Sequence, residues 1–331
     1  MYNIKIIERS EKKQLMEENQ KVAERSRSHG KLLLTGEYFV LDGAKSFAVP
    51  TKYGQDLSIE SINESKLIWQ SFSENGECWL EAIFNLPKLR LGNATYEANE
   101  DGGKDVLAEN LKKILLETRK LNPAFLNSEK GFLVKTNLDF PRNWGLGTSS
   151  TLINNIANWA KVNPYELLEN TFGGSGYDIA CAQHKSPILF MKHNTKIVVE
   201  EVNFNPAFKD QLYFVYLNKK QNSREGIEHY KKMKGNLISE IKQISDLTNA
   251  FLTCENLTDF EKLMKEHELI VSKTIQLKPI QEQLFSDYFG QTKSLGAWGG
   301  DFILATGNAD TANYFNQKGF SIVIPYQKMV L

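Results

Sequence analysis

Residues 145–150 read Gly-Leu-Gly-Thr-Ser-Ser and stand between a predicted strand and a predicted helix. Residues 132–138 alternate between apolar and polar side chains, as a strand does, and Pro141 ends that strand. After the glycines, one face of a helix is marked by Leu152, Ile153, Ile156, Ala157 and Ala160. The first turn of a helix carries unpaired N–H groups and about half a positive charge. This order of elements therefore predicts an anion-binding loop at residues 145–150.

Three other glycine-rich segments are spread along the chain. Residues 30–38 read Gly-Lys-Leu-Leu-Leu-Thr-Gly-Glu-Tyr, residues 173–178 read Gly-Gly-Ser-Gly-Tyr-Asp, and residues 296–301 read Gly-Ala-Trp-Gly-Gly-Asp. Glycine lets the main chain come close to a phosphate, whose oxygens then accept hydrogen bonds from N–H groups. One such loop is common, but four that converge, with a lysine and an aspartate beside them, predict a site for phosphoryl transfer.

Composition narrows the class of protein. The chain has 331 residues, of which 41% are apolar and 24% charged, as in a globular protein of two domains. Lys plus Arg and Asp plus Glu number 40 each, and this balance argues against a nucleic-acid binder. No apolar run reaches the roughly 18 residues that a bilayer requires, so no membrane partner is expected. Three widely spaced cysteines indicate a reducing compartment, and we expect a cytoplasmic protein.

The pattern of apolar residues organises the chain into two expected domains. We expect an N-terminal nucleotide-binding domain over residues 26–200 and a C-terminal domain over residues 201–331, while residues 1–25 form an extension without an assigned role and without the apolar core of a signal peptide. The elements expected are strands within 27–60, including 38–41, a helix at 105–120, mainly helices from 226 to 278, and a strand, a helix and a strand from 302 to 324.

The glycine segments resemble the motifs of the GHMP small-molecule kinases, named for galactokinase, homoserine kinase, mevalonate kinase and phosphomevalonate kinase. Residues 28–38, 141–150 and 293–300 are similar to the family's three motifs, in the family's order. Residues 174–178 are similar to the Ser-Gly-x-Asp segment of the mevalonate kinase and phosphomevalonate kinase branches, and residues 176–180, Gly-Tyr-Asp-Ile-Ala, also resemble a bacterial subgroup. The chain departs from the motifs at Thr148, Trp298 and Asp301, where the family commonly has serine, glycine or another small residue.

The resemblance implies an α+β fold of two domains. The N-terminal domain would be ribosomal S5-like, and the C-terminal domain would be ferredoxin-like with extra helices. ATP and Mg²⁺ are the implied cofactors, with ATP bound in the cleft between the domains. Small-molecule substrates are the expected partners, and the sequence leaves a homodimer open.

The resemblance also implies roles for single residues. Asp178 would be the general base and Lys31 the cation beside it. Ser149 would hold Mg²⁺, and Glu166 is a weaker second candidate. The ATP phosphates would be bound by Gly145, Leu146, Gly147, Thr148, Ser149 and Ser150. The acceptor pocket would be formed by His29, Glu37, Ser175, Gly176, Gly296, Ala297 and Gly299.

Two of these assignments carry alternatives. Glu37 is expected to orient Lys31, to lie in the metal shell, or to be purely structural. Trp298 is expected either to cover the site or to pack in the core.

The reaction implied is ATP-dependent phosphorylation of a hydroxyl or phosphate on a small metabolite, with mevalonate or phosphomevalonate as the first candidates. One alternative keeps the fold and changes the chemistry to that of diphosphomevalonate decarboxylase, although the Tyr-Trp-Gly-Lys run usual in that branch is missing from the sequence. Another alternative is a nucleotide- or metabolite-binding sensor without turnover. A P-loop NTPase is excluded by the lack of a G-x-x-x-x-G-K-[ST] motif.

Overall fold

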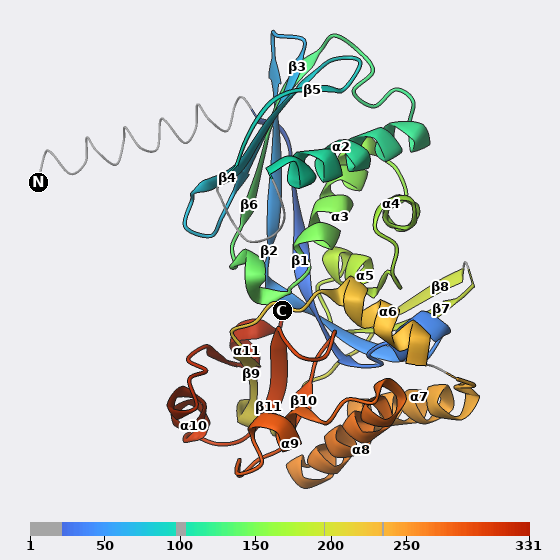
Figure 1. The fold of residues 1–331 in the computed structure, drawn as a ribbon, viewed down its shortest axis with the longest axis vertical. Coiled ribbons are helices and arrows are strands. Elements are labelled where there is room, and N and C mark those ends of the chain that lie inside the picture. The colour runs from blue at the N-terminus through green and yellow to red at the C-terminus, as the bar shows by residue number, and fades with distance from the viewer. Residues whose placement is uncertain (1–21, 97–103, 195, 234) are drawn as a thin grey trace, which may run out of the picture. The chain divides into compact units, whose positions relative to one another are not determined.

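A computed structural model describes residues 22–96, 104–194, 196–233 and 235–331, so most of the expected extension at residues 1–25 lies outside the described residues. The chain divides into two compact units (Figure 1). Unit 1 comprises Met1–Ser28, Gln55–Phe140 and Leu152–Gly173, and unit 2 comprises His29–Gly54, Pro141–Thr151 and Gly174–Leu331. This division differs from the expected boundary near residue 200, because two strands and one helix each contribute residues to both units.

Unit 1 is built on a mixed sheet with the strand order β5-β4-β3-β6-β2. Only the pair β3–β6 is parallel among the neighbours in this order. The side chains alternate along β3, where Trp69 is fully buried, so one face of that strand belongs to the core. The elements are β2 (Ser46–Ile62), β3 (Lys66–Phe72), β4 (Cys78–Asn85), β5 (Arg90–Tyr96), α2 (Lys104–Leu121), β6 (Gly131–Leu138) and α4 (Pro164–Thr171).

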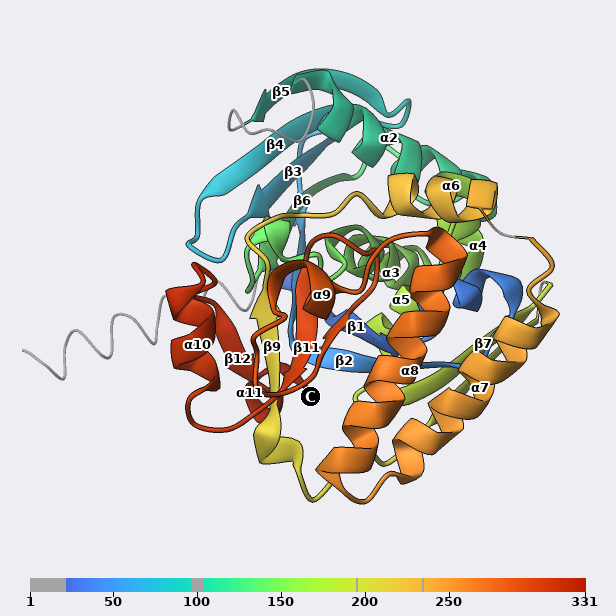
Figure 2. The same ribbon diagram turned by 60° about the horizontal axis from the view of Figure 1, so that its bottom comes forward.

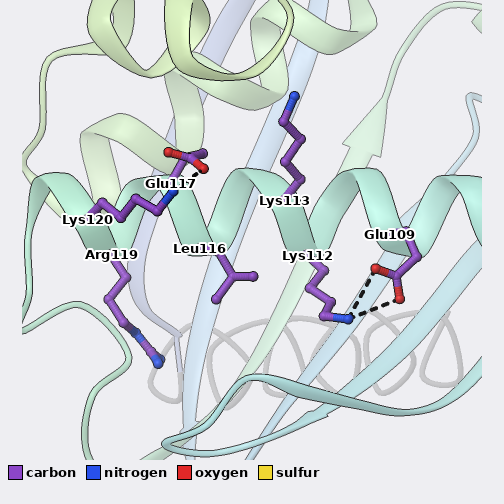
Figure 3. A pocket seen from close by; sticks show the side chains of 7 residues that line it. All are labelled: Glu109, Lys112, Lys113, Leu116, Glu117, Arg119 and Lys120. Carbon is purple, nitrogen blue, oxygen red and sulfur yellow. Dashed lines mark hydrogen bonds and ion pairs between the residues drawn. The ribbon is translucent and has the colours of Figure 1, made fainter.

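The outer face of α2 is charged and pairs its own side chains. Figure 3 shows a hollow lined by residues of this helix, in which Lys112 contacts Glu109 at 3.1 Å and Lys120 contacts Glu117 at 2.7 Å. Ion pairs three residues apart on an exposed helix stabilise it by about 0.2–0.5 kcal/mol each. We assign this hollow to the solvated face of the helix and place no site in it.

Unit 2 contains the strand order β2-β7-β8, formed with β7 (Ile188–His193) and β8 (Lys196–Glu201), and the end of β1 (Val22–Thr35) pairs with β2. The expected strand at residues 38–41 is wrong, since a 3-10 helix, η1 (Phe39–Asp42), replaces it. Positive φ angles at Tyr38 (62°) and Gly43 (91°) bracket the helix. A short apolar run is ambiguous between strand and helix, and here the positive φ angles of Tyr38 and Gly43 turn the chain at both ends of the helix.

A second sheet in unit 2 has the antiparallel order β10-β11-β9-β12. Its strands are β9 (Leu212–Tyr216), β10 (Thr292–Ser294), β11 (Phe302–Thr306) and β12 (Val323–Pro325). In chain order, helices separate β9 from β10 and α10 separates β11 from β12, which is the β-α-β-β-α-β arrangement of a ferredoxin-like fold. The expectation of a ferredoxin-like part with extra helices is therefore confirmed.

Of the helices after β8, α6, α7 and α8 pack on one another, while α9 and α11 pack on strands of the second sheet. Figure 2 shows α7 and α8 side by side, and a core cluster joins their buried side chains to Tyr230 of α6 and to Trp298. The helices are α6 (Ser223–Met233), α7 (Ile238–Thr253), α8 (Leu257–Ile275), α9 (Ile280–Leu284), α10 (Thr311–Gln317) and α11 (Tyr326–Met329). Among the described residues, none of the helices combines the length and apolar character that a bilayer crossing requires.

Candidate functional site

The loop at residues 145–147 has the backbone of an anion-binding nest. It follows a short 3-10 helix, η2 (Arg142–Trp144), and leads directly into α3 (Thr148–Ala160). Gly145 and Gly147 have φ angles of +68° and +96°, which L side chains rarely adopt. This loop and all the residues built around it below belong to unit 2.

Hydrogen bonds hold three successive carbonyl groups of the loop. The Lys31 Nζ donates to Gly145 O at 2.7 Å, and the Lys31 main-chain N–H donates to Leu146 O at 3.0 Å. The third carbonyl, of Gly147, accepts from the N–H of Thr151 at 3.0 Å. In a trans peptide the N–H points away from the carbonyl, so the next N–H along the chain faces the opposite side in each case. Of the loop residues that follow these carbonyls, Leu146 is buried, while Gly147 and Thr148 are partly exposed and can direct their N–H groups to an anion.

Asp178 lies beside this loop, as the sequence predicts. It is the second residue of α5 (Tyr177–Gln183), which begins after Gly176 with φ +93°. Ser150 of α3 lies beside the Asp178 carboxylate, and its hydroxyl donates to Gly147 O at 2.8 Å. Asp178 Oδ1 accepts from the N–H of Ile179 at 3.1 Å. The carboxylate is therefore fixed by its own helix and lies beside the first turn of α3.

Two opposing influences set the protonation of Asp178. Burial raises the pKa of its carboxyl above the ordinary value, while Lys31 and Ser150 act to lower it. The Lys31 Nζ also lies 5.9 Å from the centroid of the Tyr177 ring, a cation–π contact. A carboxylate with a raised pKa beside a lysine is a stronger proton acceptor than a solvated aspartate.

A second carboxylate, Asp301, lies against the same loop from the end of the third glycine segment. A Cβ atom added to Gly145 would overlap the Asp301 carboxylate, so the two residues are in direct contact. Asp301 Oδ1 accepts from the N–H of Gln221 at 3.1 Å. Burial raises the pKa of Asp301 and Lys31 lowers it. The sequence interpretation assigned no role to Asp301, although its only signal, the departure from small residues at this position, was visible.

Unit 2 also contains a buried ionic cluster, formed by Glu37, Lys293, His267 and Glu268. Glu37, Lys293 and His267 have 0% exposure and Glu268 has 1%. Glu37 Oε1 pairs with Lys293 Nζ, and Glu37 Oε2 lies 3.2 Å from His267 Nε2. Glu37 therefore joins the first glycine segment to the lysine ahead of the third. This supports the structural alternative and corrects the expectation that Glu37 orients Lys31 or contacts a substrate.

Hydrogen bonding shows where the proton of this cluster lies. The N–H of Gly36 donates to His267 Nε2 at 2.9 Å, so that nitrogen is an acceptor and His267 is neutral. Glu37 Oε2 lies 3.2 Å from the same nitrogen and makes no hydrogen bond. Burial raises the pKa of Glu37 to about 7, against the lowering effect of Lys293, and burial lowers the pKa of His267.

Glu268 is the second buried carboxyl whose charge Lys293 influences. It accepts hydrogen bonds from the N–H and the hydroxyl of Ser294 and from the N–H of Ile280. Burial raises its pKa, but these donors and Lys293 favour the charged form. Both carboxyls near Lys293 thus have raised pKa values, and Glu37 is mainly protonated below about pH 7.

This arrangement predicts opposite pH dependences for two variants. Above the ordinary pKa of 4.5, native Glu37 keeps a proton that the unfolded chain releases, so its contribution to stability falls as pH rises toward about 7. Native His267 stays neutral below 6.5, where the unfolded chain gains a proton, so its contribution falls as pH decreases. The two effects offset each other in the native protein.

We therefore expect Glu37→Gln to lose stability as pH falls below about 6.5 and His267→Gln to lose it as pH rises from about 4.5 to 7, with slopes approaching 1.4 kcal/mol per pH unit. Urea unfolding at several pH values measures both slopes. Parallel slopes in the two variants would contradict the assignment.

The residues expected in the acceptor pocket lie around the same loop segments. His29 is half-buried, two residues before Lys31 on β1, so the two side chains share a face of that strand. Ser175 and Gly176 lead directly into α5. Gly296 and Gly299 have φ angles of +62° and +98° and shape a turn.

That turn is tied to the first glycine segment. The N–H of Trp298 donates to the Tyr38 hydroxyl at 3.2 Å, and Ala297 is buried against Gly226 of α6. Trp298 itself is 4% exposed and belongs to the core, so the packing alternative holds. The roles of these pocket residues in binding an acceptor remain predictions.

The two expected metal ligands, Ser149 and Glu166, belong to different units of the chain. Ser149 is exposed in the first turn of α3, next to the loop. Glu166 lies in the first turn of α4 and belongs to unit 1, so the site built here does not include it. Within the described part of the chain, no three His, Cys, Asp or Glu side chains gather into a cluster that could hold a metal ion by itself.

Comparison with known proteins gives support at the level of the fold. No family model matches the sequence, and no curated protein matches it significantly. Among solved structures, the mevalonate kinase of Methanococcus jannaschii has a TM-score of 0.64 at 18% identity, over 89% of this chain and 94% of that one. The Lactococcus lactis galactokinase complexed with galactose has a TM-score of 0.63 at 14% identity, over 89% of each chain.

The Streptococcus pneumoniae phosphomevalonate kinase has a TM-score of 0.60 at 14% identity and covers 89% of this chain and 96% of its own. These neighbours are GHMP kinases, and the similarity extends over nearly the whole of each chain. The two-domain α+β architecture implied by the glycine segments is thereby confirmed. The chain has the fold of the GHMP kinases.

Proposed function

We propose that this protein transfers the γ-phosphoryl group of ATP to a hydroxyl group of a small metabolite. The observation that carries the proposal is that Ser150 and Lys31 both lie against Gly147 of the loop and that Asp178 lies beside both of them. A base, a cation and an anion-binding loop are thus in one place. Phosphoryl transfer needs mainly such positioning and charge stabilisation from a protein.

The loop supplies the groups that bind the nucleotide. Its N–H groups face away from the carbonyls held by Lys31 and Thr151, and the first turn of α3 adds its partial positive charge. Mg²⁺ fits this site, because the exposed Ser149 hydroxyl and nearby carboxylates are the hard oxygen ligands it prefers. When bound, Mg²⁺ would neutralise charge on the β- and γ-phosphates.

Each step of the transfer has a residue to serve it. Asp178 accepts the proton of the acceptor hydroxyl while the hydroxyl oxygen forms its bond to the γ-phosphorus. The bond between that phosphorus and the β–γ bridging oxygen breaks, and ADP leaves with the electron pair. Lys31 compensates the charge on the transferred group and keeps Asp178 ionised in spite of its burial.

The base favours an alcohol as the acceptor. A phosphate monoester has its second pKa near about 6, so its oxygens are already ionised at neutral pH and need no base. An alcohol keeps its proton until a base removes it. Mevalonate is therefore the first acceptor to test, because structural neighbours include mevalonate kinases, and phosphomevalonate is the second.

ADP release, measured over mevalonate, phosphomevalonate, homoserine and sugars with ATP and Mg²⁺, tests the proposal. We expect turnover with one acceptor that depends on both acceptor and ATP. Nucleotide binding without turnover on any acceptor would favour the sensor. Release of CO₂ from diphosphomevalonate would favour the decarboxylase.

A further inference from the structure

Asp301 is in an unexpected position for a site that binds phosphate. Its two carboxylate oxygens lie against the Cα of Gly145, the first residue of the anion-binding loop. A carboxylate there repels a triphosphate bound at the loop, because like charges close together in a partly buried place interact unfavourably. Lys31 and Lys220 both act on the charge of Asp301, and Lys31 also donates to Gly145 O and acts on Asp178. A triphosphate brings more negative charge than these two lysines balance, so a further cation accompanies it.

The side chain of Asp301 is not needed to hold its own segment in place. Its main-chain N–H donates to Lys219 O at 2.7 Å, and its carbonyl accepts from the N–H of Leu217 at 2.8 Å. Its φ angle of 54° is one that glycine adopts more readily. A glycine would therefore meet the backbone requirements, and the carboxylate needs another explanation.

We propose that Asp301 is the carboxylate that holds the nucleotide-bound Mg²⁺ in this chain. The inference rests on the proposed function. Oδ1 accepts one hydrogen bond from Gln221, which orients the group and leaves ligand positions on both oxygens. Asp178, the other carboxylate near Lys31, stays available as the base.

The chemistry of Mg²⁺ suits a single carboxylate at this place. Mg²⁺ usually binds to proteins through one or two carboxylates together with substrate phosphates and water, and rarely through a cage made only of side chains. This agrees with the absence of a preformed cluster of three ligating side chains among the residues that the structure describes. In the site, Ser149 and Asp301 would flank the phosphates that complete the coordination.

The Asp301→Asn variant isolates the charge. Asparagine tolerates a positive φ, keeps the size of the side chain and can still accept from Gln221 through its amide oxygen. If Asp301 only holds Gln221 in place, the variant should behave like the native protein. If Asp301 is a metal ligand, the variant should bind Mg²⁺ more weakly. Asp287→Asn is the matched control, because that exposed carboxylate pairs with Lys318 at 2.8 Å and lies outside the site.

Calorimetric titration with ADP, with and without Mg²⁺, measures how much the metal strengthens nucleotide binding. We expect this Mg²⁺-dependent gain to fall at least tenfold in Asp301→Asn and to be unchanged in Asp287→Asn. Without Mg²⁺, Asp301→Asn should bind ADP as tightly as the native protein or more tightly, because the repulsion is gone. Asp301→Gly provides the same comparison if the asparagine variant does not fold.

Three results would overturn the inference. The gain from Mg²⁺ could be the same in Asp301→Asn and the native protein. Binding could tighten equally with and without Mg²⁺, which would make the carboxylate a barrier to the nucleotide instead of a metal ligand. The native protein could fail to bind ADP under either condition, in which case the proposed function falls and this inference falls with it.

Discussion

The Asp178→Asn variant is expected to lose about 10²- to 10⁴-fold in turnover, the range typical of removing a general base. Asparagine has nearly the same shape, so the loop, Lys31 and Ser150 remain in place to bind the nucleotide. Because burial raises the pKa of Asp178, the folded protein disfavours its charged form. The variant should therefore unfold at the same temperature as the native protein or at a higher one.

Three measurements separate this role from a structural one. Turnover, nucleotide affinity and thermal unfolding are compared with the native protein. The native rate should increase as pH rises through the raised pKa of Asp178, and the residual rate of the variant should lack that acid limb. Turnover within tenfold of the native rate, or a collapse of nucleotide binding and stability together, would show that Asp178 is not the base.

The Lys293→Met variant is expected to lose about 3–5 kcal/mol of stability, because removal of one partner leaves a buried charge without compensation. Lys293 is fully buried, pairs with Glu37 and lies near Glu268. Methionine fills similar apolar space but cannot balance a carboxylate. Urea unfolding at neutral pH measures the loss.

The double variant Lys293→Met/Glu268→Gln and a surface control make this test specific. The double variant should lose less stability than the sum of the two single losses, because it no longer buries a carboxylate without a cation. Lys242→Met removes an exposed pair with Asp246 and should cost no more than about 1 kcal/mol. A loss in Lys293→Met no larger than in Lys242→Met would mean that the buried cluster does not contribute as described.

The local elements of the site could be predicted from the sequence because their signals are local. The strand, glycine loop and helix around residues 145–150 follow from periodicity and from two glycines that the structure places at positive φ. The helix α5 that begins beside Asp178 was not predicted, because the glycines before it indicate a loop. The glycine motifs also carried the resemblance that predicted the two-domain fold.

The partners of buried charges could not be predicted, because they come from distant parts of the chain. Glu37 and Lys293 are 256 residues apart, and no spacing rule links them. Glu268 and His267 read as ordinary residues of a helix until the fold buries them. The run at residues 38–41 was misassigned because four apolar residues fit a strand as well as a single helical turn.

The contact between Gly145 and Asp301 restricts how these two positions can evolve. Any Cβ at position 145 meets both an unfavourable backbone angle and the carboxylate, so a replacement there is barred twice. A shorter side chain at position 301 would remove the clash with the carboxylate but would leave the unfavourable φ angle of residue 145. Which residues position 145 tolerates should therefore depend on the residue at position 301, 156 positions later in the chain. Substitutions at the two positions should be correlated.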